Sequence, residues 1–568
     1  MSRIQGVRAR AVQWGLGLVL LCAMTFALLA PKGAGAVLNP PPGGPILVIT
    51  SPTSTFGAFY GEILRNEGLN EFAMADIGSV TATTLAAYDV VVLAKATLTP
   101  IQASMFATWV NGGGNLIAMA PDAQLAPTLG LTATGTTLAE GYLLINTAAA
   151  PGAGLVNQTM QYHGTADRYA LNGATSVATL YSNATTATVH PAVTTRSVGT
   201  GSASAFTYDL ATSVVYMRQG NPAWATQDRD SSPLIAPLIR SNDKFFGNAI
   251  GDPQPDWIDL SKVAIPQADE QQRLLANLIL HVNKNKKPLP RFWYLPHGKK
   301  AAVIMTGDDH GNGGTAGRFD QLAAASPAGC SLADWECLRG TSYIYTSTPL
   351  SDAQASAYNA AGFEVGIHIS TACDNYTLAS LQSNYTTQIA EWQTKYASLP
   401  APITQRHHCI AWSDWTTGAD VELANGIRLD TNYYFWPPGW VGNVPGNFTG
   451  SAMPMRFSAL NGNLIDVYQA QTQMTDESGQ TYPFTIDALL DRAVGAEGYY
   501  GVYTVNAHTD LAVIPESTTV IASAKARGVP VISSRQMLTW LDGRNSSSFG
   551  SFTWNGSTLG FTISAAAN

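Results

Sequence analysis

Short apolar runs alternate with amphipathic stretches along the chain, and this alternation is typical of parallel α/β folds. Threonine and proline at 99–100 are a suitable N-cap and first residue for one of the helices. In the first part of the chain the pattern predicts strands at 46–50, 90–93 and 116–120, and helices at 57–66, 100–112 and 268–283.

Between about 140 and 225, the sequence is rich in Thr, Ser, Ala, Val and Tyr with short alternations, which indicates a β insertion. The segments at 45–130 and 230–285 resemble the flavodoxin-like, class I glutamine-amidotransferase-like fold. Amidotransferase chemistry needs a nucleophilic cysteine. It is excluded here because residues 37–329 contain none.

After the basic, proline-bearing linker at 284–290, the pattern repeats as strand, polar turn and helix. Seven or eight such units in about 250 residues predict a distorted (β/α)7–8 barrel, whose chemistry lies at the carboxyl ends of the strands. The expected strands lie near 301–307, 341–346, 363–369, 403–407, 427–432, 464–469, 500–507 and 529–533, and the expected helices near 352–361, 377–398, 418–425, 484–494, 515–527 and 534–541.

Four regions follow from these patterns. We expect a signal peptide at 1–36, a flavodoxin-like domain with its β insertion at 37–285, a barrel at 286–545 and a C-terminal β hairpin at 546–568. Asn555-Gly556, between two alternating stretches, is the turn signal for that hairpin.

The N-terminus predicts export. Basic residues precede an apolar run from Gly15 to Ala30, and a small-x-small site ending at Ala36 follows, as in a secretory signal peptide. An uncleaved anchor is the alternative. We therefore expect a secreted or cell-surface protein that is not inserted in a membrane after cleavage. We also expect a monomer.

Charge narrows the choice of partner. The 568 residues carry a net charge of −8, but residues 1–36 hold four basic and no acidic residues. The remaining chain has 27 basic against 39 acidic residues, a net charge of −12. This balance argues against nucleic acid as a partner and is compatible with a neutral or cationic polymer.

Four cysteines follow the signal segment, an even number that favours two disulfides in an exported protein. The favoured pairs are Cys330 with Cys337, which closes a short loop, and Cys373 with Cys409. Other pairings stay open. Ligation of a soft metal is disfavoured, because the sequence has no CxxC pair.

Polar residues follow several predicted barrel strands. Two adjacent carboxylates, Asp308 and Asp309, end the first strand, where their repulsion is relieved by a shared cation or proton. His310, His368, His407, His408 and His508 all lie at strand ends. A single histidine is often structural, but five at one edge of a barrel indicate a metal centre.

The order Thr306-x-Asp308-Asp309, Glu364-x-Gly366-x-His368, Arg406 and His508-Thr509-Asp510 resembles the polysaccharide deacetylase (NodB-homology) superfamily over about 295–545. The resemblance implies removal of acetyl groups from N-acetylhexosamine units of an extracellular polysaccharide. It implies that Asp308 is the general base, Arg406 orients that base and His508 is the general acid, with Asp510 as a residue that could orient His508. Asp309 and His368 become ligands of a divalent metal, with Zn²⁺ the expected ion.

The sequence departs from the family pattern at Ala372, where a second histidine of the metal motif is usual. His408 is the expected replacement ligand, with His310 and His407 as rivals. In this respect the chain is similar to divergent exopolysaccharide deacetylases of the galactosaminogalactan type. The missing ligand also motivates an alternative function, a catalytically silent carbohydrate-binding or matrix protein.

Aromatic residues cluster after the strands that carry the histidines. Trp412, Tyr434, Trp436 and Trp440 are candidates for stacking on sugar rings, with packing at the barrel rim as the alternative. A glycosidase with paired carboxylates is a further reading, but it leaves the histidines unexplained.

Overall fold

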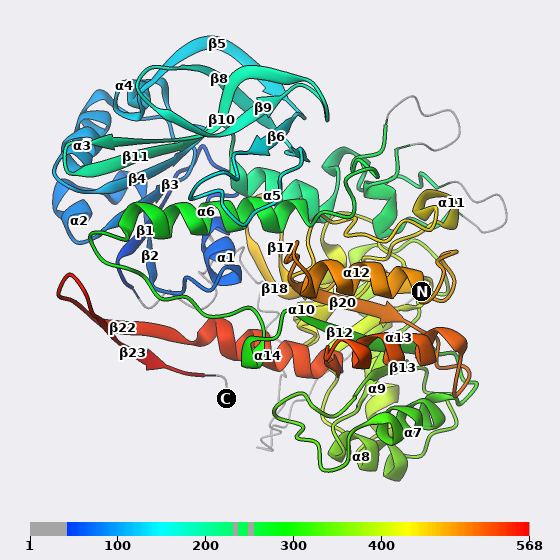
Figure 1. The fold of residues 1–568 in the computed structure, drawn as a ribbon. Coiled ribbons are helices and arrows are strands. Elements are labelled where there is room, and N and C mark those ends of the chain that lie inside the picture. The colour runs from blue at the N-terminus through cyan, green and yellow to red at the C-terminus, as the bar shows by residue number, and fades with distance from the viewer. Residues whose placement is uncertain (1–42, 231–236, 248–254, 567–568) are drawn as a thin grey trace, which may run out of the picture. The chain divides into compact units, whose positions relative to one another are not determined.

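The computed structural model describes residues 43–230, 237–247 and 255–566, so the predicted signal peptide lies outside the described residues. Among them, nine strands form a first sheet (Figure 1). Five adjacent strands run parallel in the order 2-1-3-4-5 of flavodoxin-like sheets. They are β2 (Phe72–Asp76), β1 (Ile46–Thr50), β3 (Val90–Leu93), β4 (Asn115–Met119) and β11 (Gly201–Phe206).

The β insertion continues this sheet. Four strands extend it with antiparallel pairing: β10 (Ala187–Val198), β9 (Thr175–Tyr181), β6 (Tyr142–Ile145) and β7 (Met160–Gln161). A separate pair is formed by β5 (Leu131–Ala139) and β8 (Thr165–Leu171). The helices of this region are α1 (Phe59–Asn66), α2 (Ala82–Ala86), α3 (Pro100–Asn111), α4 (Ala126–Leu129), α5 (Leu210–Gln219) and α6 (Gln267–Asn283).

A second sheet of ten described strands forms after residue 300. It is parallel apart from one edge pair, and its strands are largely buried. The strands are β12 (Ala301–Asp309), β13 (Thr341–Ile344), β14 (Glu364–Ile369), β15 (Thr404–His407), β16 (Leu429–Asp430), β17 (Met455–Ser458), β18 (Leu464–Gln469), β19 (Thr472–Thr475), β20 (Gly501–Asn506) and β21 (Val531–Ile532).

This sheet differs from a regular barrel in how its ends meet. β18 pairs with β16, and β19 pairs with β20 on the opposite side of β12. Only Ala470 and Gln471 separate β18 from β19. One bent stretch of chain therefore belongs to both ends of a curled sheet, although no ladder between described strands closes the ring.

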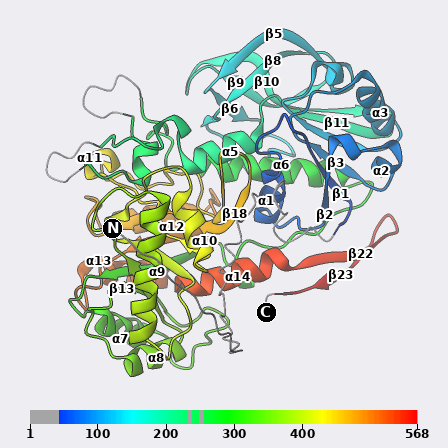
Figure 2. The ribbon, with the colours of Figure 1, turned by 180° about the vertical axis from the view of Figure 1, so that it is seen from behind.

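Helices cover this curled sheet in the places that the sequence predicts (Figures 1 and 2). Each expected strand and helix of the region is confirmed to within a few residues, whereas α7, α11, β17 and β19 are not predicted. The helices are α7 (Thr315–Ala325), α8 (Asp352–Ala360), α9 (Leu378–Lys395), α10 (Thr417–Ala424), α11 (Pro438–Val441), α12 (Phe484–Val494), α13 (Pro515–Ala526) and α14 (Ser534–Ser546).

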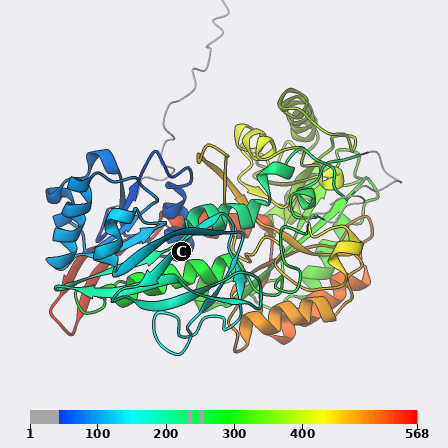
Figure 3. The ribbon, with the colours of Figure 1, turned by 90° about the horizontal axis from the view of Figure 1, so that it is seen from above.

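The C-terminal hairpin is confirmed as β22 (Ser548–Trp554) and β23 (Leu559–Ser564), which continue from α14 as a long arm (Figure 2). Figure 3 shows the first sheet and the curled sheet as two bodies, and α6 ends where the sequence predicts the change of domain. The exact domain limits stay a prediction. No described helix combines the length and apolar character that crossing a membrane requires.

Buried polar contacts join the two sheets. Arg456 on β17 pairs with Glu62 on α1 at 3.1 Å. Arg240 Nε donates to the carbonyl of Cys409 at 3.1 Å, and Ser241 Oγ donates to that of Asn432 at 3.1 Å. These contacts fix the loops after β15 and β16 against the first half of the chain.

Lys244 is fully buried between Trp412 and Tyr433, and this burial lowers its pKa to about 7. The unfolded chain then binds more protons than the folded chain between about pH 7 and the usual lysine value, so the free energy of unfolding rises with pH there. We expect Lys244→Met to raise that energy by roughly 2–5 kcal/mol below pH 7. Urea unfolding should show the gain shrinking as pH rises to 10; a gain that is independent of pH would contradict the assignment.

Candidate metal and acid–base site

Asp308 stands at the carboxyl end of β12. Its Oδ1 lies 3.3 Å from a terminal nitrogen of Arg406, and its Oδ2 accepts from Asn506 Nδ2 at 2.9 Å. The carboxylate is 4% exposed. Burial by itself would raise the pKa of Asp308, but the guanidinium of Arg406 and the protonated ring of His508 help to lower it to about 2, so the carboxylate stays ionised.

Arg406 on β15 is held from three sides. Besides Asp308, its guanidinium donates to Thr472 Oγ1 at 3.0 Å and to the carbonyl of Thr431 at 3.4 Å. It is fully buried. A guanidinium that is held in this way can keep a carboxylate in one orientation, which is the role that the resemblance implies for Arg406.

Three imidazoles meet beside this pair. One ring nitrogen each from His310, His368 and His408 lies within 4.8 Å of the others. Their ring centroids are 4.9–5.4 Å apart. Each follows or ends a different strand, so the parallel sheet brings together residues that are up to 98 positions apart.

The free nitrogen atoms of this group fit a divalent metal ion. His368 Nδ1 donates to the carbonyl of Arg406 at 2.9 Å, and His310 Nδ1 contacts Asp510 Oδ2 at 2.8 Å. This leaves Nε2 of both rings for a ligand, with the partners that metal-binding histidines usually have. His368 Nε2 and His408 Nδ1 are buried without a hydrogen-bond partner among the described residues.

Burial also favours the neutral form of His368 and His408. It lowers the pKa of His368 to about 3, and it lowers the pKa of His408 from its ordinary value. A neutral imidazole has the lone pair that a metal needs. An unpaired buried nitrogen is costly unless something binds it, so the two orphaned atoms point to a ligand shared by the three rings.

The hydrogen bonds of Asp309 favour a structural role over the ligand role expected from the sequence. Its Oδ1 accepts from the amides of Gly311, Asn312 and Gly313 at 2.9–3.1 Å, and its Oδ2 accepts from Thr315 Oγ1 at 2.7 Å. The fully buried carboxylate thus fixes the turn into α7. Side chains alternate along a strand, so Asp308 and His310 share one face and Asp309 points away.

The rival ligand His407 also lies elsewhere. Its Nε2 contacts the hydroxyl of Tyr385 at 2.8 Å, and its Nδ1 contacts the carbonyl of Ala411 at 3.1 Å. Both ring nitrogens are therefore engaged within the core. Of the two rivals to His408, the structure brings only His310 to the cluster, and it does so in addition to His408.

His508 lies on the other side of His310, with ring centroids 5.6 Å apart. Its Nδ1 contacts Asp476 Oδ1 at 2.7 Å, and its amide donates to Asp476 Oδ2 at 2.9 Å. Partial burial would lower the pKa of His508, but Asp476 and Asp308 raise it to about 9. Asp476, just after β19, is absent from the sequence-based site, and Asp510 holds His310 instead of His508.

Three of the four aromatic residues expected to stack on sugar rings are buried. Trp412 is fully buried and stacks on Phe457, and Trp440 is 4% exposed and packs against Phe448. Tyr434 is fully buried, with its hydroxyl donating to Glu477 at 2.9 Å. These rings have no face left for a sugar, because they fill the core under the rim. Trp436 alone of the four keeps a partly exposed side chain.

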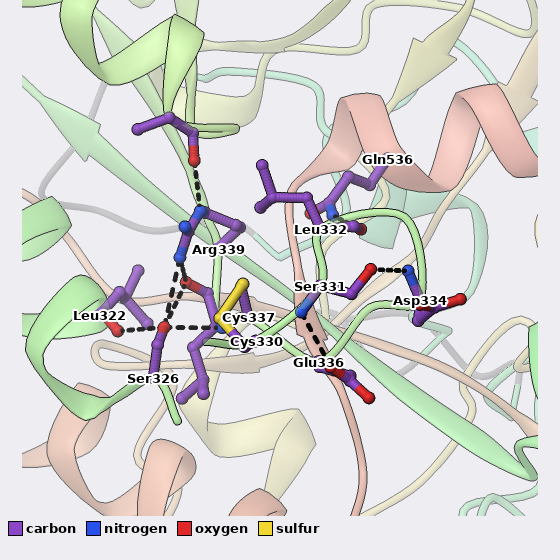
Figure 4. Close-up of a disulfide and its surroundings, with 12 residues drawn as sticks. Leu322, Ser326, Cys330, Ser331, Leu332, Asp334, Glu336, Cys337, Arg339 and Gln536 are labelled. Carbon is purple, nitrogen blue, oxygen red and sulfur yellow. Dashed lines mark hydrogen bonds between the residues drawn. A yellow bond between two sulfur atoms is a disulfide. The ribbon is translucent and has the colours of Figure 1, made fainter. Parts of the chain in front are cut away.

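Both favoured disulfides are present. Cys330–Cys337 closes the loop between α7 and β13, and Figure 4 shows that loop braced by Ser331, which contacts Glu336 and Asp334. Cys373–Cys409 links the loop after β14 to the residue that follows His408. The backbone φ is 58° at both Cys373 and Cys409, a value that is unfavourable for residues with a side chain. The Cys373–Cys409 disulfide therefore joins two loops whose backbone is strained.

The two disulfides should therefore differ in their effect on the site. We expect Cys373→Ser/Cys409→Ser to lower the free energy of unfolding by about 4 kcal/mol and to weaken metal binding. The Cys330–Cys337 disulfide closes a shorter loop. The matched Cys330→Ser/Cys337→Ser change should therefore lower the free energy of unfolding by only about 2–3 kcal/mol and leave metal binding unchanged. Urea unfolding and metal titration test both; equal metal affinity in the two variants would contradict the assigned role.

Comparisons with known proteins show only distant likenesses. The chain matches no protein-family model and no curated protein by sequence. The crystal structure described as Agd3, a novel carbohydrate deacetylase, is 11% identical over 92% of each chain, with a TM-score of 0.39. A β-galactosidase from Bacillus circulans sp. alkalophilus is 14% identical, with a TM-score of 0.25 over 30% of each chain.

An α-L-fucosidase isoenzyme 2 from Paenibacillus thiaminolyticus is 12% identical, with a TM-score of 0.24 over 30% of this chain and 29% of its own. This chain thus spans less than a third of the length of these two glycosidases. All three TM-scores lie below 0.5, so what the site does is inferred from its own residues.

Proposed function

We propose that this chain is a metal-dependent hydrolase that removes acetyl groups from N-acetylhexosamine units of an extracellular polysaccharide. One observation carries the proposal: three imidazoles, two of them with an orphaned nitrogen, adjoin the ionised Asp308 paired with Arg406 and the protonated His508 paired with Asp476. This combination offers a place for a metal ion, a base and an acid beside one another, which is what hydrolysis of an amide requires.

His310, His368 and His408 are the proposed ligands, a revision of the Asp309, His368 and His408 set expected from the sequence. A divalent ion there, with Zn²⁺ the best match to three imidazoles, would act as a Lewis acid on the acetamide carbonyl and make water a stronger acid. Asp510 and the carbonyl of Arg406 would orient two of the rings.

Asp308 is the proposed general base. It is ionised, and Arg406 and Asn506 hold its two oxygens in place. It would accept a proton from water as the water oxygen bonds to the acetyl carbon. Because Arg406 is anchored by Thr431 and Thr472, its part is to position the carboxylate and keep it charged.

His508 is the proposed general acid. Its pKa of about 9 keeps the ring protonated at neutral pH, and Asp476 fixes Nδ1 so that Nε2 carries the proton to be given. That proton would pass to the sugar nitrogen as the C–N bond breaks, leaving acetate and a sugar amine. The two disulfides fit the proposed secretion, because such bonds persist in oxidising compartments.

Asp476→Asn tests the acid assignment. Loss of the carboxylate should lower the proton affinity of His508 and free its ring, so kcat should fall by about 10²-fold while KM changes little. Steady-state kinetics on an acetylated oligosaccharide measure this. Asp320→Asn, an exposed carboxylate on α7, is the control and should leave kcat within about threefold. Equal kcat in Asp476→Asn and the wild type would contradict the role.

The direct test of the function is acetate release from a set of polymers of N-acetylglucosamine or N-acetylgalactosamine. We expect release that stops on dialysis against a chelator and returns with Zn²⁺. The alternative, a silent carbohydrate-binding protein, is favoured by Ala372 in place of a usual ligand. It predicts polymer binding without acetate release in the metal-loaded chain, and this result would overturn the hydrolase proposal.

A further inference from the structure

A cavity lies in the first half of the chain, away from the proposed catalytic residues. It has a volume of about 480 Å³ and shares no residue with the site around Asp308. Its lining comes from the first sheet, from the turn at 221–224 and from the segment at 255–260. Its volume lies within the range of about 300–1,000 Å³ that is typical of small-ligand sites.

The lining combines aromatic rings with acidic groups. Tyr142, Trp224 and Trp257 supply the rings, and Glu140, Asp256 and Asp259 supply three carboxylates. No lysine or arginine occurs among the described lining residues. A cavity with this composition attracts a cation that also has an apolar surface.

Trp257 forms a rigid wall of this cavity. Its ring is stacked on the imidazole of His163, with centroids 4.1 Å apart and planes inclined by 7°. Its Nε1 donates to the carbonyl of Tyr216 at 2.9 Å, and Trp224 meets it edge-on at 6.2 Å. Because the indole is fixed before any ligand arrives, little conformational entropy is lost on binding.

His163 supplies an independent sign of a ligand. Only 3% of this residue is exposed to solvent, and it lines the cavity. Its Nδ1 contacts Glu140 Oε2 at 2.7 Å, and Nε2 has no hydrogen-bond partner in the described part of the chain. A buried ring nitrogen of this kind is costly unless a hydroxyl, an amine or water satisfies it.

Hydrogen bonds fix two of the carboxylates, Glu140 and Asp259, in positions that suit an ammonium group. Glu140 Oε1 accepts from the amide of Gly164 at 2.7 Å, yet nearly half of its side chain (47%) remains exposed. Asp259 Oδ2 accepts from the hydroxyl of Tyr142 at 3.0 Å. Each carboxylate therefore has a fixed position and remaining acceptor capacity.

We infer that this cavity binds a cationic amino sugar, the deacetylated unit of the polymer. The ammonium group pairs with Glu140 and Asp259, the C–H surface packs on Trp257, and a hydroxyl reaches His163. Acetylation removes the positive charge and adds bulk, so the acetylated unit binds less well. The choice of ligand rests on the proposed function, and the site would keep the chain on polymer that is already partly deacetylated.

Calorimetric titration of the full chain tests this inference. The probes are hexamers of glucosamine and galactosamine and their N-acetylated counterparts, added to the Asp308→Asn chain so that the acetylated probes are not consumed. An amino hexamer should bind at least roughly tenfold more tightly than its acetylated form, and added salt should weaken it.

Two substitutions locate the binding. Glu140→Gln and Asp259→Asn should each weaken the amino hexamer by roughly tenfold, since each removes one charge and keeps the shape. Glu391→Gln, an exposed carboxylate on α9, is the matched control and should have no effect. Thermal unfolding checks that the variants are as stable as the parent chain. The side chain of Glu140 is exposed enough to be changed without disturbing the core.

Equal affinity for amino and acetylated hexamers, or unchanged affinity in both variants, overturns the inference. Failure of this site is distinct from failure of the proposed function. Acetate release from a short acetylated substrate should be the same in Glu140→Gln as in the wild type, because the cavity does not include the proposed catalytic residues.

Discussion

Asp308→Asn is expected to reduce acetate release by at least about 10³-fold while the chain keeps its metal. Asparagine preserves the size of the side chain but cannot accept the proton from water. The imidazole cluster does not include Asp308, so the ion should stay bound. Steady-state kinetics together with metal analysis of the same preparation measure both quantities.

The same change should also lower stability. Arg406 is fully buried, and loss of the opposite charge leaves its guanidinium compensated only by neutral acceptors. We expect the free energy of unfolding to fall by about 3–5 kcal/mol. Asp320→Asn, an exposed carboxylate on α7, is the control for loss of one charge. Turnover above a tenth of the wild-type rate in Asp308→Asn would rule out the base assignment.

His368→Ala is expected to remove the metal and, with it, turnover. The ring is 2% exposed, and its Nε2 is one of the two orphaned atoms of the cluster. Its loss leaves only two imidazoles, too few for tight binding of Zn²⁺. Metal content after dialysis should fall by at least about tenfold.

His297→Ala is the matched control, because that side chain is 53% exposed and contacts Asp334. It should leave metal content and turnover unchanged. His310→Ala separates the two possible ligand sets: the geometry predicts that it also loses the ion. Full metal content in His310→Ala would favour the original assignment to Asp309.

The fold of the second half is largely predictable from the sequence, because its buried strands are short apolar runs such as Val303-Ile304-Met305. β19 is missed because Thr472-Gln473-Met474-Thr475 has no such run; its polar side chains face a hydrogen-bonded interior. With β19 unrecognised, Asp476 could not be identified as the partner of His508.

The residue types of the site could be predicted from the sequence, but the contacts between its side chains could not. The histidines and carboxylates at strand ends are visible in the sequence, and the alternation of side chains along β12 was the available sign that His310, not Asp309, faces Asp308. The burial of the aromatic residues could not be predicted for another reason. Trp412 and Phe457 are far apart in the chain, so their stacking in the core is not visible in any local pattern.

The pairing of β12 with β20 has a consequence for how the protein is made. Asp308 and its partner Asn506 are separated by 198 residues, and the bent stretch at β18–β19 joins the two ends of the sheet only late in the chain. During synthesis, Asp308 and Arg406 leave the ribosome before β19 and β20. These two charged side chains therefore stay exposed to solvent until the last strands of the sheet are made. Contacts of such long range fold slowly, so a chain released before residue 508 would lack an acid and leave these charges exposed to misassembly.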